Sequence, residues 1–304
     1  MAFTSLILLS TSLISNVNAL VSSNDMPGPK ELLTVLTEAM ECADFWVAVH
    51  ATEYMIDLGY REQAERNCTK RLLRYEEVPQ QRIGLWRVQY QLASDADVKT
   101  WILDKLVAAY LTPDGLDRLH AAETLAKLRF CFRTLDQSTV RTDMQEGGAM
   151  GAFVTWGMSV ACDWHGHDDP AHLIGLLDGD AEERRLAAYG LSFLAKPTAE
   201  QWRVLAGAAL AETDEETKTY LLGAGYQLYD MGHPADEAIY GQLRTLLLAR
   251  VHSNVKSAQM ELCRALSSRS DPEGKAVLTQ LVGSGNTDIR ATAAYALLKQ
   301  YINE

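Results

Sequence analysis

Apolar residues recur along this chain in a helical pattern that returns about every 35 residues, eight times over. The clearest copies are short amphipathic stretches with small residues at their centres, at 49–60, 119–128, 184–195 and 289–301. One equivalent position carries a large apolar residue in five copies: Met55, Val88, Leu125, Leu191 and Leu297. Such self-similarity predicts a stacked array of helices, in which each unit buries its apolar face against its neighbours.

The eight prolines agree with this pattern, because each falls at an expected helix start or in a connection, where a residue without an N–H is tolerated. The first helices of eight pairs are expected at 30–41, 61–76, 95–111, 135–146, 169–178, 197–211, 234–250 and 271–283. The second helices are expected at 44–60, 79–93, 113–130, 149–163, 180–195, 214–231, 253–268 and 286–302. The sequence therefore predicts an all-α, right-handed α-solenoid of about eight helix pairs over 30–304. Glycines interrupt the pattern between 130 and 155, so 131–155 is either a joint between two halves or a degenerate repeat.

The second helices resemble HEAT repeats, especially the HEAT-like variety named after phycobilisome lyases. The consensus Asp-x-x-Val-Arg-x-x-Ala-Ala-x-Ala-Leu is close to residues 288–297 and is matched more loosely at 182–191 and 47–55. The resemblance covers most of 28–304 and implies the fold. It implies little about function, because such repeats serve as scaffolds, inhibitors, lyases and a few enzymes.

The first 19 residues contain no charged side chain and hold a leucine-rich stretch at 6–13 that closes on Val17, Asn18 and Ala19. Small residues at the last and third-last positions suit cleavage after Ala19. We therefore expect a signal peptide at 1–19, a linker at 20–29 and a secreted or periplasmic protein. The stretch lacks a preceding basic residue, so a disordered or membrane-grazing N-terminus is the alternative. It is too short and too polar for a membrane span.

Charge and cysteine content narrow the function classes. The chain has 28 basic and 40 acidic residues and a formal net charge of −12, without basic clusters, so nucleic acid is not an expected partner. Five cysteines lack metal-site spacing. In an exported protein, either Cys42–Cys68 or Cys131–Cys162 could pair, since each couple lies on neighbouring expected helices.

Two matching His/Glu pairs are the first candidates for chemistry. His50 with Glu53, and His120 with Glu123, lie two repeats apart. A spacing of three places both side chains on one helix face, where they could hold a divalent metal. The chain resembles deoxyhypusine hydroxylase, a HEAT-repeat iron enzyme, in size and repeat number. That family has four adjacent His-Glu pairs, whereas this chain has two, and Leu186 and Thr292 stand where further histidines would be needed. The alternative to a metal site is that these His and Glu side chains form hydrogen bonds along the helix surface.

A second candidate metal site is the His165-Gly166-His167 run with its flanking aspartates. It lies in an expected connection, where Asp168 or Asp169 could instead cap the next helix.

The third candidate is a binding face on the second helices. Its aromatic and arginine residues could stack on sugar rings or hold an acidic peptide, or else fill the core between repeats: Trp46, Trp86, Trp156, Tyr189, Arg82, Arg87, Arg184 and Arg185. No nucleophile-elbow, P-loop or dinucleotide motif is present, and no cofactor is expected. The sequence predicts a non-catalytic binding or scaffold protein with a protein partner, or an oligosaccharide as second choice. The alternative is a metal-dependent oxygenase built on His50, Glu53, His120 and Glu123.

Overall fold

The structure is a computed structural model that describes residues 26–162, 166–194, 197–229 and 236–302. Within these ranges all regular secondary structure is helical, so the all-α class is confirmed. In the same part of the chain, no helix has the length and apolarity needed to span a bilayer. The expected signal peptide at 1–19 and most of the expected linker lie outside the described residues.

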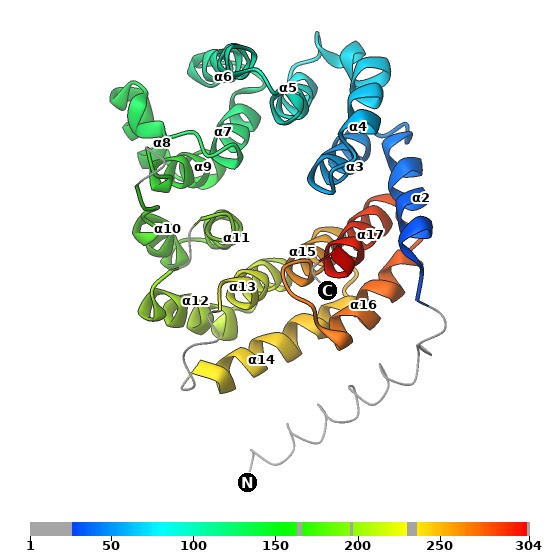
Figure 1. Cartoon of the computed structure of the whole chain (residues 1–304). Coiled ribbons are helices and arrows are strands. Elements are labelled where there is room, and N and C mark those ends of the chain that lie inside the picture. Colours follow the sequence, from blue (N-terminus) through cyan, green and yellow to red (C-terminus); the bar gives the residue numbers. More distant parts are fainter. Residues whose placement is uncertain (1–25, 163–165, 195–196, 230–235, 303–304) are drawn as a thin grey trace.

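The helices form an inner and an outer layer (Figure 1). The inner layer consists of α3 (Phe45–Asp57), α5 (Gln81–Leu92), α7 (Arg118–Lys127), α9 (Gly148–Ser159), α11 (Ala181–Leu191), α13 (Glu215–Leu228), α15 (Lys256–Leu266) and α17 (Thr287–Ile302). The outer layer consists of α2 (Pro29–Met40), α4 (Arg61–Asn67), α6 (Ala96–Leu111), α8 (Gln137–Glu146), α10 (Ala171–Gly175), α12 (Ala199–Ala211), α14 (Glu237–Leu248) and α16 (Pro272–Val282). Every pair expected from the sequence is present.

Aspartate caps set the starts of several inner helices. Asp44 accepts hydrogen bonds from the backbone N–H groups of Trp46 and Val47 and so begins α3. Asp180 forms a capping box with Glu183 at the start of α11. These carboxylates satisfy N–H groups that have no partner inside the helix, and they lie at the positive end of its dipole.

The array closes into a ring (Figure 1). Each inner helix packs against the next, from α3 to α17, and α17 then packs against α2 and α3. Hydrogen bonds cross this closure: Tyr54 Oη lies 3.1 Å from Thr292 Oγ1, and the Tyr295 hydroxyl donates to Asp57 Oδ2 at 2.7 Å. The Tyr54 and Tyr295 rings also stack, with centroids 4.4 Å apart. The two ends of the array therefore cover each other.

Arginine–aspartate pairs join successive outer helices. Arg203 on α12 binds Asp236, the N-cap of α14, with Nε and Oδ1 2.8 Å apart. Arg244 on α14 binds both carboxylate oxygens of Asp271, the N-cap of α16. Because a bidentate contact fixes the relative orientation of the two groups, each pair sets how one repeat lies on the next.

The expected helix at 61–76 is interrupted. After α4 the chain continues as a π-helical turn, Cys68–Leu72, and a 3-10 turn, Leu73–Tyr75. Gln80, just before α5, has a φ of 67°, a left-handed backbone conformation that costs a non-glycine residue on the order of 1 kcal/mol. This irregular segment leads from α4 in the outer layer to α5 in the inner layer.

Of the two cysteine pairings left open, the structure contains Cys131–Cys162, while Cys42 and Cys68 are free thiols. The disulfide joins the residue before the 3-10 turn Phe132–Thr134 to the segment after α9. The glycine-interrupted stretch at 131–155 includes α8 and α9, and α9 packs against α7, α8 and α11. Whether the ring consists of two halves stays a prediction.

We expect the Tyr295→Ala change to destabilise the ring by about 2–3 kcal/mol, because it removes the Tyr54 stack and leaves Asp57 without one of its donors. Urea denaturation measures the loss. Hydrogen exchange should rise in both α2–α3 and α17, which are far apart in sequence. Tyr60→Ala is the control, since Tyr60 is 39% exposed and takes no part in the closure. Faster exchange in α17 alone would contradict a closed ring.

Candidate functional site in the ring interior

Side chains of alternate inner helices meet across the interior of the ring. Trp46 on α3 stacks with His120 on α7 at a centroid distance of 5.6 Å, although α5 lies between these helices. Tyr189 on α11 contacts Lys127 on α7 and Arg264 on α15, each cation lying over its ring. Since neighbouring helices are bypassed in each case, these side chains must point inward.

The inward contacts form a complete circuit, which we call the interior belt. Asp288 on α17 links α15 to α3, because it binds both Lys256 and His50. The belt thus runs from α3 through α7, α11, α15 and α17 back to α3. Its members are Trp46, His50, His120, Lys127, Tyr189, Lys256, Arg264 and Asp288.

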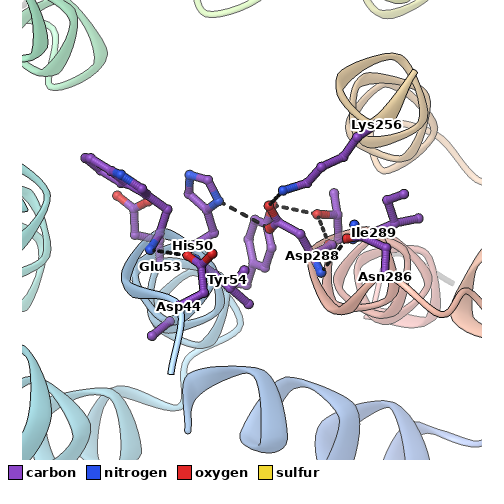
Figure 2. A network of polar contacts seen from close by, with 12 residues as sticks. Asp44, His50, Glu53, Tyr54, Lys256, Asn286, Asp288 and Ile289 are labelled. Carbon is purple, nitrogen blue, oxygen red and sulfur yellow. Dashed lines mark hydrogen bonds and ion pairs between the residues drawn. The ribbon is translucent and has the colours of Figure 1, made fainter. Parts of the chain in front are cut away.

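Figure 2 shows the part of the belt that closes the circuit. The Asp288 carboxylate lies between Lys256, at 2.7 Å, and His50 Nδ1, at 3.4 Å. Asn286 accepts from the backbone N–H groups of Asp288 and Ile289 and so caps α17. Burial raises the pKa of Asp288, but the contacts with His50 and Lys256 outweigh this effect and hold the pKa below its ordinary value.

A second buried ion pair lies beside this part of the belt. Arg87 on α5 donates to both carboxylate oxygens of Glu53 on α3, with Nη2 2.9 Å from Oε2, and reaches Thr124 on α7. Burial raises the pKa of Glu53, but the charge and hydrogen bonds of Arg87 outweigh this and lower it. One arginine thereby joins three consecutive inner helices.

The opposite side of the interior contains Glu261, which is buried and binds its helix neighbour Arg264. A methyl group at Gly223 on α13 would lie only 2.6 Å from Glu261 Oε1, so the glycine allows this close approach. Here burial raises the pKa of Glu261, and Arg264 does not fully offset the effect. Two buried glutamates in one interior are therefore shifted in opposite directions.

Three buried polar atoms in the interior have no hydrogen-bond partner among the described residues. They are Gln91 Oε1, Gln227 Nε2 and His120 Nδ1. The other end of each amide is engaged: Gln91 donates to Glu53, and Gln227 accepts from Arg264. Buried polar groups are nearly always satisfied, so these three atoms are exceptions, and each is closed off from solvent.

The structure places the four candidate metal ligands in the interior but gives their carboxylates cationic partners. Glu53 is held by Arg87, and Glu123 binds Lys127 at 2.7 Å. Burial raises the pKa of Glu123, and the charges of Lys127 and Arg87 outweigh this. Among the residues the structure describes, no group of three or more His, Cys, Asp or Glu side chains could hold a metal ion. The geometry thus agrees with the hydrogen-bonding alternative, and the metal site stays a hypothesis.

The second metal candidate lies partly outside the described residues, which omit His165 and its two predecessors. Asp168 accepts from the backbone N–H of Ala161 and binds Arg129 at 2.7 Å. Asp169 accepts from the N–H of Ala171, the first residue of α10, as expected for a helix cap.

The candidate binding residues divide into two groups. Trp46, Tyr189, Arg87 and Arg185 lie on the interior side, where Arg185 binds Glu216 of α13 at 2.8 Å. By contrast, Trp156 is 1% exposed and packs against Tyr189 and Phe193, and Trp86 is buried. Arg82 and Arg184 are engaged by Asp117 and Glu212.

Sequence reasoning missed Lys127, Lys256, Arg264 and Asp288 as site residues. Asp288 opens the best match to the HEAT-like consensus and was interpreted only as a fold signal. Lys127 and Arg264 follow Glu123 and Glu261 by one helical turn, and this i, i+4 or i, i+3 pairing is visible in the sequence. Their contacts with Tyr189 depend on how the ring closes.

The opposite shifts predict opposite pH dependence for two variants. Because the pKa of Glu53 is lowered, its contribution to stability is present above the unfolded value of 4.5 and lost as pH falls through the folded pKa. Because that of Glu261 is raised, its contribution is present below 4.5 and lost as pH rises through the folded pKa. The free energy of unfolding of the wild type minus that of Glu53→Gln should therefore rise as the pH increases through the region around 4.5. The same difference for Glu261→Gln should fall as the pH increases.

Urea denaturation over a pH series tests this, with Glu62→Gln as control because the Glu62 side chain is 93% exposed. Equal slopes of stability against pH for Glu53→Gln and Glu261→Gln would show that the two glutamates do not differ in environment.

Comparison with known proteins gives no match: no family model fits the sequence, and no curated protein and no solved structure resembles it significantly. The function is therefore inferred from the interior belt and the surface of the ring. They contain partly buried aromatic rings and paired charges, all held on helices.

Proposed function

We propose that this chain is an exported, non-catalytic binding protein whose ring interior holds an extended peptide segment of a partner protein. The ring would be a HEAT-like, right-handed array of helix pairs that curves until its ends meet. The observation that carries the proposal is the pair of partly buried aromatic rings in the interior belt, Trp46 and Tyr189.

An extended peptide suits an interior of rings and paired charges, because its backbone supplies neutral N–H donors and C=O acceptors in alternation. The aromatic faces of Trp46 and Tyr189 would pack against the side chains of the segment. Interior charges already have partners of opposite sign, so a strongly charged ligand is not favoured. An oligosaccharide, which also supplies donors and acceptors, is the second choice.

The Cys131–Cys162 disulfide supports export. Disulfides form and persist in oxidising compartments and are rare in the cytosol. Together with the uncharged leucine-rich start of the sequence, it favours a secreted or periplasmic location.

A peptide-display experiment tests the proposed binding. A phage-displayed library of random peptides is selected on the full chain, and enriched peptides are measured against variants. We expect Tyr189→Ala to weaken binding by about tenfold or more, because a central aromatic contact is lost. Tyr189→Phe keeps the ring and should retain most of the affinity, and the outward Tyr60→Ala should leave it unchanged.

Two results would overturn the proposal. One is the absence of enriched peptides, or enrichment that Tyr189→Ala does not affect. The other is stoichiometric iron or zinc in the untagged protein that is lost in both His50→Ala and His120→Ala, which would favour the metal-dependent oxygenase.

Export predicts a defined covalent state. The protein recovered from a secreting host should begin at Leu20 and contain the oxidised Cys131–Cys162 pair, with Cys42, Cys68 and Cys263 as free thiols. Intact mass and thiol labelling measure both properties. Replacing Cys131 and Cys162 together by serine should cost about 2–4 kcal/mol of stability, through the lost constraint on the unfolded chain. An uncleaved, fully reduced protein confined to the cytosol would contradict export.

A further inference from the structure

A tryptophan on the outside of the ring is exposed. Trp101 lies on α6, in the outer layer, and 58% of its surface is exposed. Burial of an indole ordinarily stabilises a protein, so an exposed one held in a fixed orientation needs an explanation. The interior belt does not supply one, because α6 belongs to the outer layer (Figure 1).

The orientation of Trp101 is fixed by Lys105, one helical turn further along α6. The Lys105 ammonium lies 4.4 Å from the ring centroid of Trp101 and 4.2 Å from that of Trp86. It also binds Glu76 Oε1 at 2.6 Å. Trp86 donates its indole N–H to the same oxygen, which ties the cluster to α5. One face of Trp101 is therefore occupied by a cation, and the exposed surface includes the other face.

The cation over the Trp101 ring is already paired. Lys105 is neutralised by Glu76, and Arg82, which lies over the Trp86 ring, binds Asp117 at 2.6 Å. Burial raises the pKa of Glu76, but hydrogen bonds from Lys105 and Trp86 outweigh this and lower it, so the carboxylate stays ionised and accepts hydrogen bonds. Among the described residues no donor reaches its second oxygen, Oε2.

We propose that Trp101, with Lys105 and Glu76 behind its covered face, is a binding platform for a neutral oligosaccharide. A pyranose ring would stack its C–H face on the indole face opposite Lys105, where the electron-rich ring attracts the polarised C–H bonds. A neighbouring sugar unit that extends past the edge of the indole would bring hydroxyl groups to Glu76 Oε2 and Lys105. This site is separate from the ring interior and does not rest on the peptide-binding proposal.

The chemistry of the platform favours a sugar over a protein surface. Trp101 lies against the Lys105–Glu76 ion pair, and a stable protein interface would need about 800 Å² per partner with an apolar centre. A neutral ligand with many hydroxyl groups can bond to both members of this pair without disrupting it. An anionic or cationic ligand would have to compete with Glu76 or Lys105 for its counter-ion.

The test is binding of neutral oligosaccharides to the full chain. Hexasaccharides of the cello-, chito-, malto-, xylo- and β-1,3-gluco- series are screened on an array, and positive sugars are then titrated by calorimetry. We expect Trp101→Ala to weaken binding by about tenfold or more and Trp101→Phe to retain most of it, since the ring face is kept. Leu116→Ala is the control, because Leu116 is an apolar residue that is 75% exposed.

Each result decides the proposal. Binding that is lost in Trp101→Ala and kept in Leu116→Ala supports it, as does weaker binding in Glu76→Gln with an unchanged melting temperature. The proposal would be overturned if none of these sugars binds at a concentration of about 10 mM, because a dissociation constant above that value is too weak for useful recognition. Binding that Tyr189→Ala abolishes and Trp101→Ala does not would assign the sugar to the interior. Selected peptides that depend on Trp101, in the absence of sugar binding, would make this surface a protein interface instead.

Discussion

The architecture depends on the contact between α17 and α2. In a stacked array each helix pair buries apolar surface only against its neighbours, so the first and last pairs would each expose a face to water. Here those faces cover each other, and Leu32 and Leu36 of α2 and Ala293 of α17 are fully buried. No separate capping repeat is then required. Closure also brings the polar groups of α3, α15 and α17 together, because Asp288 can meet His50 only where the two ends of the array lie side by side.

The interior differs from the usual apolar core because it is crossed by charges and aromatic rings. Buried ion pairs add little net stability, but they penalise any arrangement in which one partner is left alone. Arg87 illustrates this, since its guanidinium must lie near Glu53 of the preceding inner helix and Thr124 of the following one. Such pairs would select one curvature for the array. Because these charged groups bind one another, the aromatic faces are the main part of the interior left for contact with a ligand.

The sequence predicts the helices well and the site poorly, for a physical reason. Helix limits depend on local features such as apolar periodicity, prolines and aspartate caps, and α3, α6 and α12 begin within one or two residues of expectation. Exceptions include 61–76, which the π-helical turn Cys68–Leu72 interrupts, and α7, which begins at Arg118 where 113 was expected. The partners of Glu53 and Glu123 depend on which side chain of the next turn or repeat lies opposite. The sequence does not predict Trp101 as a binding residue, because the binding face is expected only on the second helix of each pair. The exposure of Trp101 also depends on how Lys105 and Trp86 are arranged.

A closed ring also constrains the order in which the chain can fold. Away from the closure, helices pack mainly against helices that lie near them in the sequence, and these contacts can form progressively as the chain emerges. The closure contacts, such as Tyr54 with Thr292, join residues 238 positions apart and cannot form until α17 is present. Until then the apolar side of α2 lacks its cover and offers a surface to chaperones or to another unfinished chain. A single docking event, that of α17 on α2 and α3, therefore covers this surface and completes the ring.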